Sequence, residues 1–204
     1  NSENALRHAI AVAIKSEGTL HLIHVKPQRA SSIFSSKEEQ AIAKNIEKGL
    51  QQLTEDAIRE APMCMVQNVI LQGKPPVELL RYAHNLQDSM IVVGTHGTSG
   101  FDEKQVGSNT LRIVSESKVP VLSVRENINI GRDLTQILVP IDESFETLQK
   151  IKYAVLFAEL FNAKLILLGT YTSPTRESKH VINVQLGHAR SMAQKANVRY
   201  EVRT

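Results

Sequence analysis

The stretch from Ile91 to Thr110 reads IVVGTHGTSGFDEKQVGSNT and predicts a short strand, a glycine-containing loop and the start of a helix. Its first three residues are apolar, as in a buried strand, and Gly94 ends them. Gly107–Ser108 then opens a helix in which Leu111 and Val114 are spaced as one apolar face. A helix start presents unpaired backbone N–H groups, so this junction suits the binding of an anion.

The glycines allow two interpretations. In the first, Gly94 and Gly97 leave room for a ribose or a phosphate, Gly107 lets a phosphate approach the backbone, and Ser108 offers its hydroxyl and its N–H. In the second, Ser108 caps a helix and the glycines only make turns. The spacing matches neither the P-loop nor the dinucleotide motif G-x-G-x-x-G. It is instead Gly94, two residues, Gly97, nine residues, then Gly107 and Ser108.

Composition and charge exclude several classes of protein. The 204 residues are 42% hydrophobic and 22% charged, as in an ordinary globular protein. The formal charge of +3 is not gathered into a basic run, and an aromatic content of 4% offers few stacking platforms, which argues against a nucleic-acid partner. No apolar run approaches the roughly 18 residues of a membrane span, and no signal peptide is recognisable. We therefore expect a cytoplasmic protein, and we expect Cys64 to be a buried apolar residue without redox function.

Helices and strands are predicted to alternate along the first part of the chain. Such alternation predicts a parallel sheet with helices on both faces, and ligands then bind beyond the carboxyl ends of the strands, where the loop between Gly94 and Ser108 lies. The predicted helices are 1–17, 37–60, a short one around 77–83 and one from 108, and the predicted strands are 19–25, 65–71, 91–93 and 119–124.

A second series of elements begins after a linker at 127–134. It comprises a strand at 136–142, a helix at 143–162, a strand at 164–170, a helix at 178–196 and a strand at 198–202. At a fixed offset of 145 residues, similar residues coincide, which indicates an internal repeat: Ala9 with Ala154, Ala13 with Ala158, Leu20 with Leu165 and Leu22 with Leu167. We therefore predict two tandem domains, 1–126 and 135–204.

The two predicted domains lack different parts. The first has no counterpart of the strand 136–142, and the second has no counterpart of the glycine stretch. We expect the sequence to be a fragment in which the first strand of domain 1 and the second half of domain 2 are missing. In the alternative, the second domain lends its strand to the first by swapping.

Two separate signatures resemble the universal stress protein family, in particular its tandem-domain members. One is the glycine motif together with the strand VPVLSVR at 119–125, and the other is ILVPIDES at 137–144, which is similar to the family's opening strand and its acidic residue. The resemblance covers most of the chain. It implies, for each repeat, a doubly wound α/β fold with a five-stranded parallel sheet, flavodoxin-like and similar to the adenine nucleotide alpha hydrolases.

The resemblance also implies a nucleotide site. The strand-end Asp and the residue that ends the second strand would line an adenosine pocket, and the glycine motif would hold ribose and phosphates. The ligand would be ATP or AMP, with any Mg²⁺ held mainly by phosphate and water oxygens. Carried over to this sequence, the nucleotide-binding residues are Val25, Gly94, His96, Gly97, Gly107, Ser108, Asn109 and Asp142. Because the second domain has Asp142 but no glycine motif, the first domain is the expected site.

No catalytic residue is assigned. His96 could titrate near neutral pH, but no carboxylate stands beside it in the sequence as an orienting partner. His21 and His24 fall on opposite faces of a strand and so cannot pair on a metal. We therefore expect a stress-response protein that binds an adenine nucleotide and changes conformation or assembly. The alternatives are a slow ATPase using Ser108 or His96, and a dimerisation or regulatory module that binds no nucleotide.

Pairing of domains is also expected. The apolar strand 119–124 ends its domain, and an exposed strand edge of this kind is usually covered. We expect it to pair with the last strand of another domain, either within the chain as a pseudo-dimer or between two chains as a homodimer.

Overall fold

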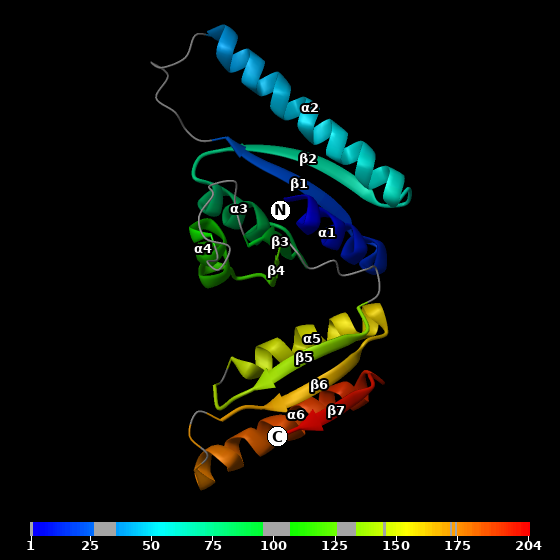
Figure 1. Ribbon diagram of the computed structural model, residues 1–204, viewed down its shortest axis with the longest axis vertical. Coiled ribbons are helices and arrows are strands. Elements are labelled where there is room, and N and C mark those ends of the chain that lie inside the picture. The colour runs from blue at the N-terminus through cyan, green and yellow to red at the C-terminus, as the bar shows by residue number, and fades with distance from the viewer. Residues whose placement is uncertain are drawn as a thin grey trace. The chain divides into compact units, whose positions relative to one another are not determined.

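The computed structural model describes residues 2–26, 36–95, 107–125, 134–144, 146–171, 173 and 175–204. The chain divides into two compact units, unit 1 at Asn1–Asn129 and unit 2 at Ile130–Thr204 (Figure 1). Each unit is an α/β structure with parallel strands. No helix in the described ranges is long and apolar enough to cross a membrane.

The strands of unit 1 form two separate parallel pairs. β1 (Thr19–Lys26) pairs with β2 (Met65–Gln72) over eight positions, from Thr19 beside Met65 to Lys26 beside Gln72. β3 (Ile91–Gly94) pairs with β4 (Val121–Val124) over four. Among the described residues, no pairing joins the two sheets.

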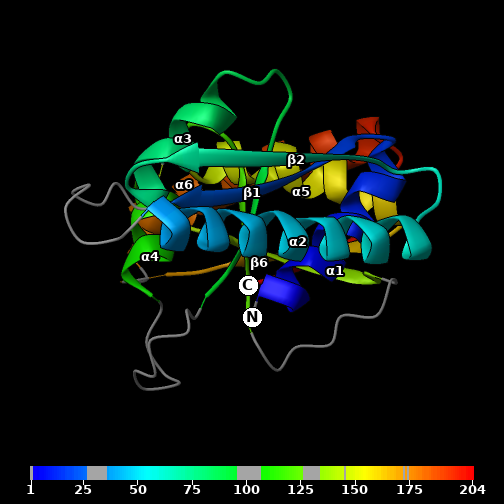
Figure 2. The same ribbon diagram turned by 90° about the horizontal axis from the view of Figure 1, so that it is seen from above.

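Helices cover both faces of β1. Leu20 and Leu22 pack into a core with α1 (Ser2–Ser16) and α2 (Ser36–Glu60), and α2 lies along β1 and β2 (Figure 1, Figure 2). His21 points to the other face, where its Nδ1 lies 2.8 Å from the hydroxyl of Tyr82 on α3 (Pro75–His84). α3 also contacts α4 (Ser108–Glu116), and the two share a second small core with β3. The predicted arrangement of helices on both faces is therefore confirmed for β1.

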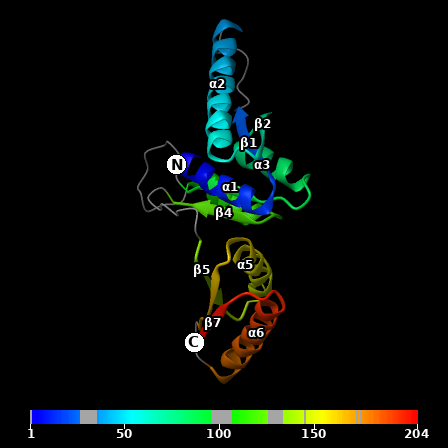
Figure 3. The ribbon, with the colours of Figure 1, turned by 90° about the vertical axis from the view of Figure 1, so that its right-hand side faces the viewer.

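Unit 2 contains one three-stranded parallel sheet in the order β5-β6-β7. Its elements are β5 (Gln136–Ile141), α5 (Thr147–Phe161), β6 (Lys164–Gly169), α6 (Arg176–Lys195) and β7 (Tyr200–Arg203). Both helices lie on one side of the strands (Figure 3). The alternating residues Val139, Ile141, Leu165 and Leu167 face them and are at most 3% exposed, whereas Leu138 on the opposite face is 58% exposed.

Two details differ from the prediction. Leu111 and Val114 are 61% and 50% exposed, and the buried face of α4 carries Thr110 and Ile113 instead. The reason is a hydrogen bond from the Thr110 hydroxyl to the carbonyl of Gly94, which turns that side of the helix inward. The second difference is that α5 begins at Thr147, four residues later than predicted. The predicted five-stranded sheet and tandem repeat stay predictions, because the described residues form sheets of two, two and three strands.

Candidate functional site

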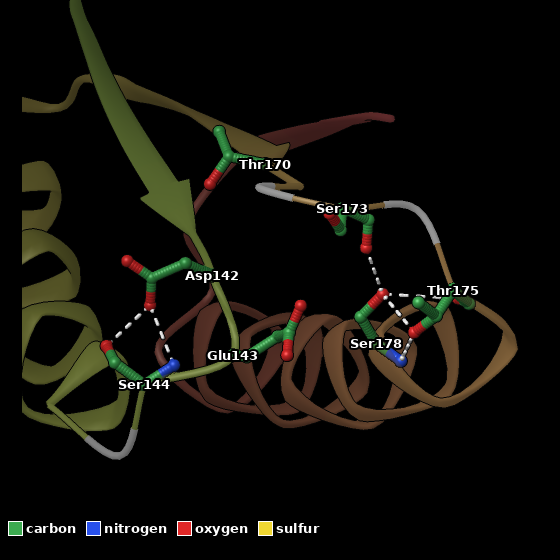
Figure 4. Close-up of a pocket in the computed structure, with 7 residues that line it drawn as sticks. All are labelled: Asp142, Glu143, Ser144, Thr170, Ser173, Thr175 and Ser178. Carbon is green, nitrogen blue, oxygen red and sulfur yellow. Dashed lines mark hydrogen bonds between the residues drawn. The ribbon is translucent and has the colours of Figure 1, made fainter.

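A polar pocket of about 410 Å³ opens at the carboxyl ends of β5 and β6 in unit 2 (Figure 4). This is the edge at which parallel α/β sheets bind ligands, and the volume is within the range of small-molecule sites. Two segments that follow the strands, together with the start of α6, supply the walls. The lining residues are Asp142, Glu143, Ser144, Thr170, Ser173, Thr175 and Ser178.

Asp142 follows directly on β5 and is held by a tight turn. Its Oδ1 accepts hydrogen bonds from the backbone N–H of Ser144 at 3.0 Å and from the hydroxyls of Ser144 and Thr147, each at 2.5 Å. Thr147 is fully buried at the start of α5. The carboxylate is therefore fixed by three donors on one oxygen.

The same donors keep Asp142 ionised. Hydrogen bonds from Ser144 and then Thr147 lower the pKa of Asp142 far below its ordinary value, and Lys150, whose Nζ lies 3.7 Å from Oδ2, adds a small attraction. Because Oδ1 carries all three bonds, Oδ2 retains acceptor capacity. The pocket thus presents a carboxylate that can accept a hydrogen bond from a ligand.

The opposite wall is built from hydroxyls at the start of α6. Thr175 caps the helix by accepting from the N–H of Ser178, and the Ser178 hydroxyl donates to the carbonyl of Ser173 at 2.7 Å. Thr170, just beyond β6, donates to the carbonyl of Ile141 at 3.2 Å and so joins the two strand ends. Glu143 extends toward this wall (Figure 4).

The lining determines which ligands this pocket can hold. Among the described residues its lining has two carboxylates, five hydroxyl side chains and no Lys, Arg or His, although Nζ of Lys150 lies 3.7 Å from Oδ2 of Asp142. Such a surface suits a ligand that donates hydrogen bonds, such as the hydroxyls of a ribose or an exocyclic amine, and it disfavours a phosphate. Within the described residues no group of three or more His, Cys, Asp or Glu side chains could hold a metal ion.

In unit 1, the end of β3 and the start of α4 are joined by backbone hydrogen bonds. The N–H of Gly107 donates to the carbonyl of Thr95 at 2.7 Å, and the N–H of Thr95 donates to Val124 at 2.9 Å. Gly107 is the N-cap of α4 and has no side chain to bond the first turn. In the second interpretation of the glycines Ser108 caps this helix, but the N-cap is Gly107 and Ser108 is the first helical residue. The first-turn N–H groups of α4, at Ser108, Asn109 and Thr110, therefore have no cap from Gly107.

The structure brings together some of the predicted site residues. Gly94, Gly107, Ser108 and Asn109 gather at the junction of β3 and α4, with Ser108 and Asn109 exposed. Val25 lies near the end of β1 and is half-buried. Asp142 is in the pocket of unit 2, and His96 and Gly97 lie outside the described residues.

The sequence prediction missed the hydroxyl residues of the unit 2 pocket. Thr170 and Thr175 belong to different segments and converge only when β5 and β6 pair. A local signal was nevertheless present, because Thr175 and Ser178 have the spacing of a helix cap.

The family of the chain follows from comparison with known proteins. Residues 1–125, more than half of the chain, match the sequence profile of the Universal stress protein family. The chain belongs to this family. The universal stress protein YxiE of Bacillus subtilis (strain 168) is 29% identical over 134 residues, which cover 61% of this chain and 90% of YxiE.

Solved structures show the same fold. A universal stress protein from Archaeoglobus fulgidus DSM 4304 superposes with a TM-score of 0.73 at 18% identity, covering 100% of this chain and 71% of that one. The functionally unknown protein PA1789 from Pseudomonas aeruginosa PAO1 gives a TM-score of 0.60 at 15% identity, covering 98% of this chain and 68% of that one. The resemblance predicted from the glycine motif is thus confirmed at the level of the family and its α/β fold.

Proposed function

We propose that this universal stress protein binds an adenine nucleotide, ATP or AMP, at the junction of β3 and α4 in unit 1. The observation that carries the proposal is the start of α4, where Gly107 places uncapped backbone N–H groups beside the end of β3. The positive end of a helix and its free N–H groups favour a phosphate. Ser108 and Asn109 are exposed there and can add polar side chains.

The conformation of Gly107 supports a role in ligand approach. Its φ of −56° and ψ of 142° are open to any residue, so the backbone itself does not require glycine. An absent side chain is useful if a phosphate must reach the N–H groups. Mg²⁺ would then be held mainly by phosphate and water oxygens.

The pocket of unit 2 suits a separate ligand of the adenosine type. Asp142 and the surrounding hydroxyls can bind ribose hydroxyls, and the described lining residues include no cationic side chain for a phosphate. We therefore assign to it an adenosine-type ligand, in keeping with a tandem arrangement of two domains. Binding would act through a change in conformation or in pairing by β4, within a chain or between two copies. A slow ATPase is the alternative, for which the described residues supply no oriented general base.

Calorimetric titration with ATP and Mg²⁺ tests the proposal. We expect saturable binding that Gly107→Val weakens at least roughly tenfold, or about 1.4 kcal/mol. Gly49→Val is the matched control, because Gly49 lies within α2 and nothing lies within 4 Å of an added Cβ. Equal affinities for the two variants, or no binding by the native chain, would overturn the proposal and leave a pairing module without nucleotide.

A further inference from the structure

The buried face of α6 carries two polar side chains among its apolar ones. Ser178 and Gln185 are 4% and 8% exposed and lie on the same side of the helix, about 10 Å apart along its axis, with the fully buried Ile182 between them. Ser178 lines the pocket of unit 2, whereas Gln185 is not among the lining residues. Glutamine is seldom buried this deeply, so its hydrogen bonds indicate what it holds in place.

Gln185 joins α6 to the turn that follows β5. Its Nε2 donates to the backbone carbonyl of Ser144 at 3.1 Å. Ser144 in turn donates to Oδ1 of Asp142, from its N–H at 3.0 Å and from its hydroxyl at 2.5 Å. Ser144 is therefore held on one side by the carboxylate that it fixes and on the other side by the amide of Gln185.

This contact connects the two walls of the pocket. One wall is the turn that carries Asp142, and the other is the start of α6, where Thr175 and Ser178 supply hydroxyls. The helix continues without a break from Arg176 to Lys195, so its first turn and Gln185 form one rigid element. The hydrogen bond from Gln185 thus fixes the position of the Asp142 turn relative to the hydroxyl wall.

The other atom of the same amide indicates that this position is not occupied for stability. Oε1 of Gln185 is buried and has no hydrogen-bond partner among the described residues. A buried acceptor without a partner lowers stability, and an apolar side chain of the same length would avoid that loss. Such unfavourable polar groups are typical of functional sites, where stability is lower than packing alone would allow.

We infer that Gln185 is a positioning residue for the pocket of unit 2. It holds the Ser144 turn, and through that turn it holds the carboxylate of Asp142 at a fixed distance from the hydroxyls of Thr175 and Ser178. A ligand that bonds to both walls then enters a preformed site and loses less free energy in ordering it. The inference rests on the adenosine-type ligand proposed for this pocket.

A purely structural role of Gln185 gives a different expectation. If Gln185 only filled the core, methionine, which has a similar length and volume, would leave Asp142 unaffected. If Gln185 positions the turn, methionine loosens Ser144, whose hydrogen bond is the largest cause of the lowered pKa of Asp142. The stability of unit 2 should stay about equal in that case, because removal of the buried Oε1 offsets the lost hydrogen bond.

The substitution Gln185→Met in the full chain tests the inference. Gln194→Met is the matched control, because Gln194 lies toward the other end of α6, is exposed, and donates to the hydroxyl of Tyr200 at 2.9 Å. We expect Gln185→Met to raise the pKa of Asp142 toward its ordinary value in a carbon-13 titration. In calorimetry it should weaken adenosine binding about threefold to tenfold, with an unchanged midpoint of urea denaturation. Gln194→Met should leave the pKa and the affinity as in the native chain.

The pKa of Asp142 separates this inference from the ligand assignment. If the native chain binds no adenosine but Gln185→Met raises the pKa, the ligand assignment fails and the positioning role is supported. An unchanged pKa in folded Gln185→Met would overturn the inference, whatever the affinity. Gln185→Asn is the second variant, since its amide is one methylene too short to hold Ser144 in the same place. It should raise the pKa as well, and an unchanged value in that variant would equally overturn the inference.

Discussion

Replacing Thr147 by Val tests how the pocket of unit 2 is held. Thr147 is fully buried, and its hydroxyl donates to Oδ1 of Asp142 at 2.5 Å. Valine keeps the shape of the side chain but removes this donor. A hydrogen bond to an ionised group contributes about 1.5–3 kcal/mol, but the Asp142 side chain is 45% exposed and keeps two donors from Ser144. With solvent screening, we expect unit 2 to lose about 1 kcal/mol.

The loss should depend on pH in a defined direction. The donors lower the pKa of Asp142 in the folded protein below the ordinary value of about 3.9 of the unfolded chain. A lowered folded pKa gives stability that is present above the unfolded pKa and disappears as the pH falls through the folded value. The unfolded pKa is the same for the native protein and Thr147→Val, so the difference in their unfolding free energies should be greatest near neutral pH and narrow only as the pH falls through the folded pKa of the variant toward that of the native protein.

Urea denaturation followed through the NMR signals of unit 2, at pH 7 and at the lowest pH at which the protein stays folded, measures this difference, and a carbon-13 titration of Asp142 reports its pKa directly. Thr170→Val is the matched control, because its hydroxyl donates to the carbonyl of Ile141, which does not titrate. Thr170→Val should lower the unfolding free energy of unit 2 by the same amount at both pH values. If Thr147→Val also has a pH-independent cost and leaves the pKa of Asp142 unchanged, the assigned hydrogen bonds do not hold the carboxylate.

Further predictions concern stability and charge. Leu167→Ala should destabilise unit 2 by about 2–5 kcal/mol in urea denaturation because Leu167 is fully buried, whereas Leu138→Ala, at 58% exposure, should change it by less than about 0.5 kcal/mol. Gly73→Ala should destabilise unit 1 by about 1–3 kcal/mol, seen as a lower melting temperature, since Gly73 has a φ of 146°. Arg203→Gln should raise the pKa of Glu201 from about 2 toward its ordinary value in an NMR titration, because the Arg203 hydrogen bond is the largest cause of the lowering.

The sequence was sufficient to place the helices and strands because hydrophobic periodicity is local. The strand predicted at 164–170 is β6 at Lys164–Gly169, and the helix predicted at 1–17 is α1 at Ser2–Ser16. The buried face predicted from periodicity was wrong at α4, where a tertiary hydrogen bond from Thr110 to Gly94 accompanies burial of the other side of the helix. The predicted start of α5 was also wrong, because the residues before Thr147 form a turn after β5, and the Thr147 hydroxyl donates to Asp142.

The candidate site was predicted less completely than the fold. Asp142 was predicted through the resemblance to the universal stress protein family, as the family's strand-end Asp, and it lines the unit 2 pocket. The hydroxyls of Thr170, Ser173 and Thr175 were not predicted as site residues. A serine or threonine in a loop shows no pattern of a binding site in the sequence, and these loops come together only when the strands pair. Nucleotide binding by the predicted residues stays a prediction, and the calorimetric titration tests it.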